Sequence, residues 1–190
     1  MNPLKIIPLI ALGIGALAAP SAQANEWVLG PAFKEGWKPQ FTVAAMGGVL
    51  NPDEDKLSDG DAYYGVEISL NCPWFAPPTG SIRQQFWIGR YDENDVTFTS
   101  FEVNPRYFID LSPNWSLGAG PGFGYLKADT PFRDGVDMFT LQLGADLSYR
   151  IGPLFLGVGA RYQFTDDKEI APGVDGADNW VAVGKIGVNF

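Results

Sequence analysis

The sequence of 190 residues contains no histidine and only one cysteine, Cys72. The lack of histidine excludes any mechanism that needs an imidazole base and any metal site that needs an imidazole ligand. A single cysteine cannot form an intramolecular disulfide, so we expect Cys72 to be a buried or interfacial thiol without a chemical role.

Basic residues are also scarce. Lysine and arginine number 13 against 22 acidic residues, for a net charge of −9. Because binding to phosphate backbones needs basic patches, this balance excludes nucleic acid as a partner. Beyond residue 24 no apolar run is long enough for a membrane-spanning helix, so any membrane role must use strands.

The N-terminus carries the features of a secretory signal peptide. Lys5 precedes the apolar stretch 6–19, and Ser21-Ala22-Gln23-Ala24 places small residues where a signal peptidase reads them. The apolar stretch is shorter than the roughly 20 residues that a spanning helix needs, which disfavours a membrane anchor. We therefore predict cleavage after Ala24, a periplasmic or interfacial segment over 25–38, and one folded domain over 39–190.

The domain reads as strands in which apolar and polar residues alternate, separated by turn residues. We predict eight strands, at about 40–50, 62–72, 81–91, 96–110, 115–126, 137–151, 154–164 and 179–190. Each has about the 9–11 residues with which a tilted strand crosses a bilayer, or more. The fold class we predict is all-β: an eight-stranded antiparallel up-and-down transmembrane β-barrel.

Alternation alone does not separate a membrane barrel from a soluble lipocalin-like barrel, whose faces are reversed. Along 137–151, Phe139 and Leu141 share one face with further apolar residues, while Thr140, Gln142 and Asp146 share the other. The polar faces are rich in glycine and serine with isolated charges, which suits a crowded interior better than a solvated exterior. We therefore favour the membrane barrel and keep the soluble carrier as an alternative.

Acidic residues are confined to alternate connections between the strands. The connections 51–61, 91–95, 127–137 and 165–179 hold 5, 3, 3 and 5 acids, or 16 of the 22, and the connections 72–80, 111–114 and 152–153 hold none. An up-and-down barrel puts alternate connections on opposite sides, and membrane barrels have short periplasmic turns and longer outer loops. We therefore expect acidic extracellular loops and periplasmic termini.

The chain resembles the small outer-membrane β-barrel proteins of the OmpA-like and OmpX-like group. The resemblance lies in Ala22-Gln23-Ala24, the glycine-rich run 117–124, the strand segment 161–164 and the ending Ile186-Gly187-Val188-Asn189-Phe190. It implies that Phe190 is part of the signal read by the barrel-assembly machinery, and that outer-membrane lipid and lipopolysaccharide surround the protein.

A fainter resemblance connects the chain to lipid A deacylases, which are also eight-stranded outer-membrane barrels. In those enzymes a catalytic His-Ser pair follows an Arg-Tyr-Gln-like run, and here Phe164-Thr165 stand in those places. Without the histidine, deacylase chemistry cannot be carried over, and we expect no enzymatic activity and no cofactor. A lipid-modifying enzyme, or a degenerate relative of one, stays as the alternative.

Several charged residues fall on the inward faces of the predicted strands. A charge on the lipid face would cost about 2–4 kcal/mol near the midplane, so we place them inside as a lumen charge network. Asp146 with Arg161, and Glu67 or Glu102 with Arg83 or Arg106, are the expected pairs. The network comprises Glu67, Arg83, Glu102, Arg106, Asp110, Asp146, Arg150, Arg161 and Lys185.

We expect this network to act as a salt-bridged plug, with a narrow pore or a polar binding cavity as the alternative. The acids at 53–61 and 166–169 could offer oxygen ligands to calcium, but their spacing is not that of a known calcium loop and we expect no metal. Aromatic residues at the strand ends predict interfacial girdles, formed by Trp180, Tyr125 and Phe164 at the loops and by Trp74, Tyr149 and Phe190 at the turns. The expected oligomeric state is a monomer.

Overall fold

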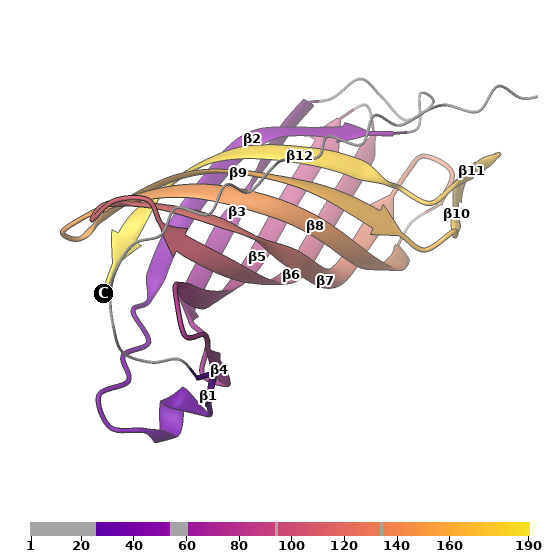
Figure 1. Ribbon diagram of the computed structural model, residues 1–190. Coiled ribbons are helices and arrows are strands. Elements are labelled where there is room, and N and C mark those ends of the chain that lie inside the picture. Colours follow the sequence, from indigo (N-terminus) through magenta and orange to yellow (C-terminus); the bar gives the residue numbers. More distant parts are fainter. Residues whose placement is uncertain (1–25, 54–60, 94, 134) are drawn as a thin grey trace, which may run out of the picture.

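Eight long antiparallel strands close into a barrel, which Figure 1 shows from the side. The computed structural model describes residues 26–53, 61–93, 95–133 and 135–190. The barrel strands are β2 (Thr42–Pro52), β3 (Asp61–Asn71), β5 (Ser81–Glu93), β6 (Val96–Asp110), β7 (Trp115–Asp129), β8 (Val136–Ile151), β9 (Leu154–Thr165) and β12 (Asn179–Asn189).

Each barrel strand pairs with the next one along the chain, and β12 closes the sheet by pairing with β2. The prediction of an eight-stranded up-and-down barrel is confirmed, and every predicted strand boundary lies within three residues of the observed one. The predicted signal peptide lies outside the described residues. None of the described residues forms a helix long and apolar enough to cross a membrane.

The outer surface of the barrel is apolar. On β8, Leu141 and Leu143 are exposed, whereas Thr140, Gln142 and Asp146 on the opposite face are buried. Other strands follow the same rule, with exposed outward residues that include Val66, Ile68, Ile88, Phe101, Leu117, Phe123, Leu156, Val158, Ile186 and Val188. A soluble lipocalin-like barrel would have the reverse orientation, so this arrangement favours a lipid-facing exterior.

Aromatic side chains sit at both ends of the strands. Trp180 contacts Tyr162 at 4.8 Å between ring centroids, and Tyr125 contacts Phe139 at 5.9 Å. These four residues lie near the acidic connections, at what we call the loop end. At the opposite end, which we call the turn end, Trp115 and Tyr149 pair at 5.0 Å. Two aromatic girdles of this kind are typical of barrels with a bilayer around them.

Five short elements were not predicted. They are β1 (Val28–Leu29), the 3-10 helix η1 (Pro31–Phe33), β4 (Phe75–Ala76), β10 (Glu169–Ala171) and β11 (Val174–Asp175). Because β1 pairs with β4, the segment after residue 25 lies against the connection between β3 and β5 at the turn end. The β10–β11 hairpin lies at the opposite, loop end (Figure 1).

The interior of the barrel is layered along its axis. A cluster of buried apolar residues fills the loop end, and charged side chains fill the middle. Toward the turn end the buried residues are mainly polar and include Thr42, Ser69, Arg83, Ser116 and Ser148. This layering places the candidate functional groups in the middle of the barrel and at its turn end.

Candidate functional site

Four ion pairs cross the middle of the lumen. The Nζ of Lys185 lies 2.6 Å from Glu67 Oε2 and 2.5 Å from Asp146 Oδ1. Arg161 Nη2 lies 2.5 Å from Glu102 Oε1, and Arg106 Nε lies 3.3 Å from Asp146 Oδ2. Every one of these side chains is at most 5% exposed. We call these six residues the ion-pair belt.

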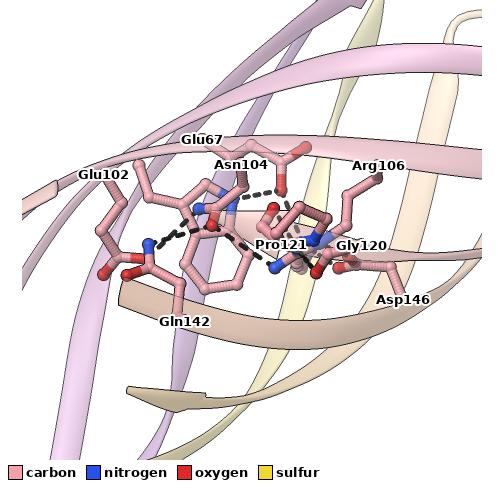
Figure 2. A network of polar contacts seen from close by, with 10 residues as sticks. Glu67, Glu102, Asn104, Arg106, Gly120, Pro121, Gln142 and Asp146 are labelled. Atoms are coloured by element: carbon pink, nitrogen blue, oxygen red, sulfur yellow. Dashed lines mark hydrogen bonds and ion pairs between the residues drawn. The ribbon is translucent and has the colours of Figure 1, made fainter. Parts of the chain in front are cut away.

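Neutral side chains surround the ion-pair belt and donate hydrogen bonds to it. Trp87 on β5 lies between Glu67 and Glu102 in the strand register and donates its Nε1–H to Glu67 Oε2 at 3.0 Å. Its ring lies 4.3 Å from Lys185 Nζ, within the range of a cation–π contact. Gln142 donates from its amide nitrogen to Glu102 at 3.2 Å and to Asn104 at 3.0 Å (Figure 2). The belt therefore holds its charges by hydrogen bonds as well as by ion pairing.

Arg106 has a second role at the seam between β6 and β7. The register places Pro105 and Pro121 opposite each other, inside the interval from Val103–Phe123 to Tyr107–Ala119 where no pairs are formed. Because proline has no N–H, neither residue can donate across the ladder. The Nη1 of Arg106 donates instead to the carbonyl oxygens of Gly120 and Pro121 (Figure 2).

The structure places most of the predicted network inside the lumen. Seven of its members are buried, namely Glu67, Arg83, Glu102, Arg106, Asp146, Arg161 and Lys185. Arg150 is half-buried at the turn end. Asp110 has the same parity on β6 as the buried Arg106 and Phe108, but it lies at the turn end, where it is exposed and accepts a hydrogen bond from Ser116 at 2.8 Å. As the last residue of its strand, Asp110 lies at the rim of the lumen rather than within the buried network.

The predicted pairing partners were wrong. Asp146 pairs with Arg106 and Lys185 rather than Arg161, and neither Glu67 nor Glu102 pairs with Arg83 or Arg106. The prediction places partners on neighbouring strands, whereas Lys185 on β12 reaches Asp146 on β8 across β9. The β9 residue between them is Gly159, where a Cβ atom would lie 2.6 Å from Asp146 Oδ1 and 3.3 Å from Lys185 Nζ.

The same pattern explains the pair between Arg106 on β6 and Asp146 on β8. The intervening strand β7 presents Gly118 opposite Asp146, and Gly120 in register with Arg106. Glycines on the inner face of the intervening strand leave room for partners to meet over it. The glycine-rich inner faces were visible in the sequence, and they are the signal that could have identified these longer-range pairs.

An apolar layer lies between the belt and the acidic loops. Tyr91 and Phe98 stack there with ring centroids 5.5 Å apart. Residues of the β10–β11 region, Ile170, Val174 and Ala177, are buried in the same cluster. Thr130 donates its hydroxyl to the carbonyl oxygen of Ile170 at 2.7 Å, which fixes the hairpin to the barrel. The strand pattern in the sequence does not predict this layer.

The remaining predicted features are Phe190, Cys72, the Phe164-Thr165 pair and the acidic loops, and they lie outside the ion-pair belt. Phe190 is exposed, and its backbone N–H donates to Phe41 O at 2.8 Å. Cys72 is buried. Phe164, in place of the deacylase histidine, faces outward, and the Thr165 hydroxyl donates to Asp178 at 3.1 Å and accepts from Ala177 N–H at 2.7 Å. Within the described ranges no cluster of three or more acidic or cysteine residues could hold a metal ion, and the acids at 54–59 lie outside those ranges.

Comparison with known proteins gives structural likeness at low sequence identity. No family model matches the chain, and no curated protein sequence matches it. Neisserial surface protein A aligns with a TM-score of 0.52 and 17% identity, covering 78% of this chain and 95% of that one. The N-terminal barrel domain of Pseudomonas aeruginosa OprF gives 0.49 and 17%, covering 80% and 100%, and Ail of Yersinia pestis gives 0.49 and 16%, covering 80% and 97%. The chain therefore has an eight-stranded transmembrane β-barrel fold similar to that of Neisserial surface protein A.

Proposed function

We propose that the protein is a monomeric outer-membrane barrel with a structural or interaction role, that its lumen is closed, and that its acidic loops face the outside of the cell. The observation that carries the proposal is the ion-pair belt, in which Glu67, Asp146 and Lys185 meet near the centre of the lumen. An eight-stranded barrel is just wide enough for side chains to fill. Charges paired at this position act as a plug rather than as the wall of a wide pore.

The apolar layer supports a closed lumen independently. Leu50, Tyr91, Phe98 and Leu126 are at most 1% exposed at the loop end. An ion that entered there would have to leave water before it reached the belt, at a large cost in free energy. The β10–β11 hairpin, whose own Ile170 and Val174 are buried in this cluster, adds a cover to the layer.

The exterior supports the outer membrane as the location. Exposed apolar side chains between two aromatic girdles match a lipid bilayer, and the predicted signal peptide supports export. In this location the turn end faces the periplasm, lipid and lipopolysaccharide surround the barrel, and Phe190 serves the barrel-assembly machinery. The concentration of acids at one end then leaves a negative rim toward the outside.

Two measurements test the proposal. Membrane fractionation combined with heat-modifiable gel migration should recover a folded barrel from the outer membrane. Recovery in the soluble periplasmic fraction would contradict the location. In planar bilayers the purified protein should show no steady single-channel conductance, and a steady conductance in the wild-type protein would contradict a closed lumen.

A further inference from the structure

A cavity opens at the turn end of the barrel, below the ion-pair belt. Its volume is about 410 Å³, within the range of cavities that hold small ligands. It is lined by Gln40, Thr42, Arg83, Arg150, Gly152, Pro153, Asn189 and Phe190. Two of these residues are arginines and none has an acidic side chain, in a protein whose net charge is −9.

The two arginines differ from those of the belt because they have no carboxylate partner. Among the residues that the structure describes, no acidic group lies within ion-pair distance of Arg83 or Arg150. Glu67 attracts both guanidinium groups from farther away, Asp110 attracts that of Arg150, and the two arginines repel each other. Two like charges that face one cavity without an adjacent counter-ion create a positive potential in it.

Arg83 is fixed in place by neutral acceptors. It is only 4% exposed, and its Nη2 donates to Gln40 O at 2.9 Å, to Thr42 Oγ1 at 3.1 Å and to Ser69 Oγ at 3.2 Å. Its Nη1 donates to Asn71 Oδ1 at 3.0 Å, while its Nε has no acceptor. A guanidinium held rigidly by neutral groups keeps its full charge available to the cavity.

Arg150 is half-buried, and its guanidinium group is held mainly by two aromatic rings. Its guanidinium carbon lies 5.3 Å from the ring centroid of Phe155 and 6.0 Å from that of Phe108. Among the described residues, its side chain donates one hydrogen bond, from Nη1 to Ser148 Oγ at 3.2 Å. Several of its five N–H groups are therefore open to a ligand, in the fork that matches phosphate and carboxylate oxygens.

Gln40 supplies a further donor at the rim of the cavity. Its side-chain oxygen accepts from Asn71, which leaves its amide nitrogen available, and its backbone carbonyl accepts from Arg83. Its φ of 47° lies in the left-handed region that a non-glycine residue rarely adopts. Strained backbone of this kind persists only where surrounding contacts maintain it, and it is concentrated at ligand sites.

We propose that this cavity binds an oxyanion, the phosphate or carboxylate group of a soluble ligand or of a lipid headgroup that reaches the turn end. Arg150 is the contacting cation, Gln40 is a neutral donor, and Arg83 supplies the second positive charge. That the ligand comes from the periplasmic side rests on the proposed function. The binding chemistry itself does not depend on it.

The test uses the full folded chain in a detergent with an uncharged headgroup and inorganic phosphate as the probe. Isothermal titration should show saturable binding to the wild-type protein. Arg150→Gln should weaken that binding about tenfold or more, the loss expected for a charge-assisted hydrogen bond. The matched control is Arg90→Gln, which removes an arginine that is paired with Asp92 on the exposed loop end and should leave binding unchanged.

Gln40→Gly covers the case in which Arg150→Gln does not fold. Glycine adopts a left-handed backbone without strain, so this variant should fold and should bind phosphate several-fold more weakly. An adventitious ion only, with no saturable binding by the wild-type protein, would overturn the proposal. Equal losses in Arg150→Gln and Arg90→Gln would overturn it too, because they would indicate a general charge effect.

Lipid vesicles distinguish the two sources of the anion. If a headgroup fills the cavity, phosphate binding should be lost in phospholipid vesicles, because every phospholipid headgroup carries a phosphodiester, and kept in the detergent with an uncharged headgroup. If the ligand is soluble, phosphate should bind in both. Absence of the protein from the outer membrane would contradict the proposed location and leave the phosphate result standing, so the two failures can be told apart.

Discussion

Removing the cation of the ion-pair belt should strongly destabilise the barrel. Lys185 Nζ is within 2.6 Å of both Glu67 and Asp146. Lys185→Met would leave the two carboxylates buried with one ion pair, the longer contact from Arg106 to Asp146, and the hydrogen bond from Trp87 to Glu67. Breaking a buried pair in this way costs about 3–5 kcal/mol, because an uncompensated charge stays in a poorly polar interior.

The assay is urea unfolding of the protein in detergent, followed by tryptophan fluorescence. Trp87 reports on the site directly, since its ring lies 4.3 Å from Lys185 Nζ. With a denaturant slope of about 2 kcal/mol per M, the unfolding midpoint should fall by roughly 1.5–2.5 M. Adding Glu67→Gln to Lys185→Met should recover part of this loss, because it removes one of the two stranded charges.

The control for this series is Arg90→Met. The pair of Arg90 and Asp92 has a comparable distance, 2.9 Å, but both side chains are about half exposed. Exposed pairs contribute about 0–1 kcal/mol, so the midpoint should move by less than about 0.5 M. If Lys185→Met lowered the midpoint no more than Arg90→Met, or if Glu67→Gln made the double variant worse, the assignment of a buried stabilising belt would be refuted.

Three further predictions concern the surroundings of the belt. Arg106→Met should speed hydrogen exchange of the amides along the β6–β7 seam, because it removes the donor to the carbonyls opposite Pro105; exchange at the wild-type rate would show that the seam does not depend on this side chain. Val174→Asp should release the β10–β11 hairpin, measured as faster proteolysis within 165–179, since it buries a charge in the apolar layer. Gly159→Ala should destabilise the barrel by about 1–3 kcal/mol in urea because its Cβ meets Asp146 at 2.6 Å, whereas Gly47→Ala, which meets nothing within 4 Å, should change stability by less than about 0.5 kcal/mol; equal effects would contradict the packing argument.

The strand pattern was readable from the sequence because it depends on a local rule. Side chains alternate between the two faces of a strand, so Leu141 and Gln142 have to point in opposite directions in any strand that contains both. The preference of charged groups for the lumen then followed for Glu67 and Lys185 without knowledge of their partners. The rule gives the face of a residue but not its depth, so it does not distinguish Asp110 at the rim from the buried charges.

The apolar layer was harder to predict. Tyr91, Phe98 and Leu126 follow the inward face of their strands, and alternation places them on the same side as the charges. Inward-facing residues change from charged to apolar along the barrel axis, whereas alternation distinguishes only the two faces of a strand. Ile170 and Val174 belong to a connection, where no periodicity indicates whether a residue returns to the barrel.

By itself the sequence determined the number of strands, their direction of alternation and the segregation of acids to one end, since each of these depends on residues close together in the chain. Only the tertiary structure decided which charges meet. Lys185 and Asp146 come together because barrel closure sets the stagger of β8, β9 and β12 and because Gly159 leaves the space between them open. Closure also left Arg83 and Arg150 facing one cavity without an acid beside them, through contacts between strands that are far apart in the sequence.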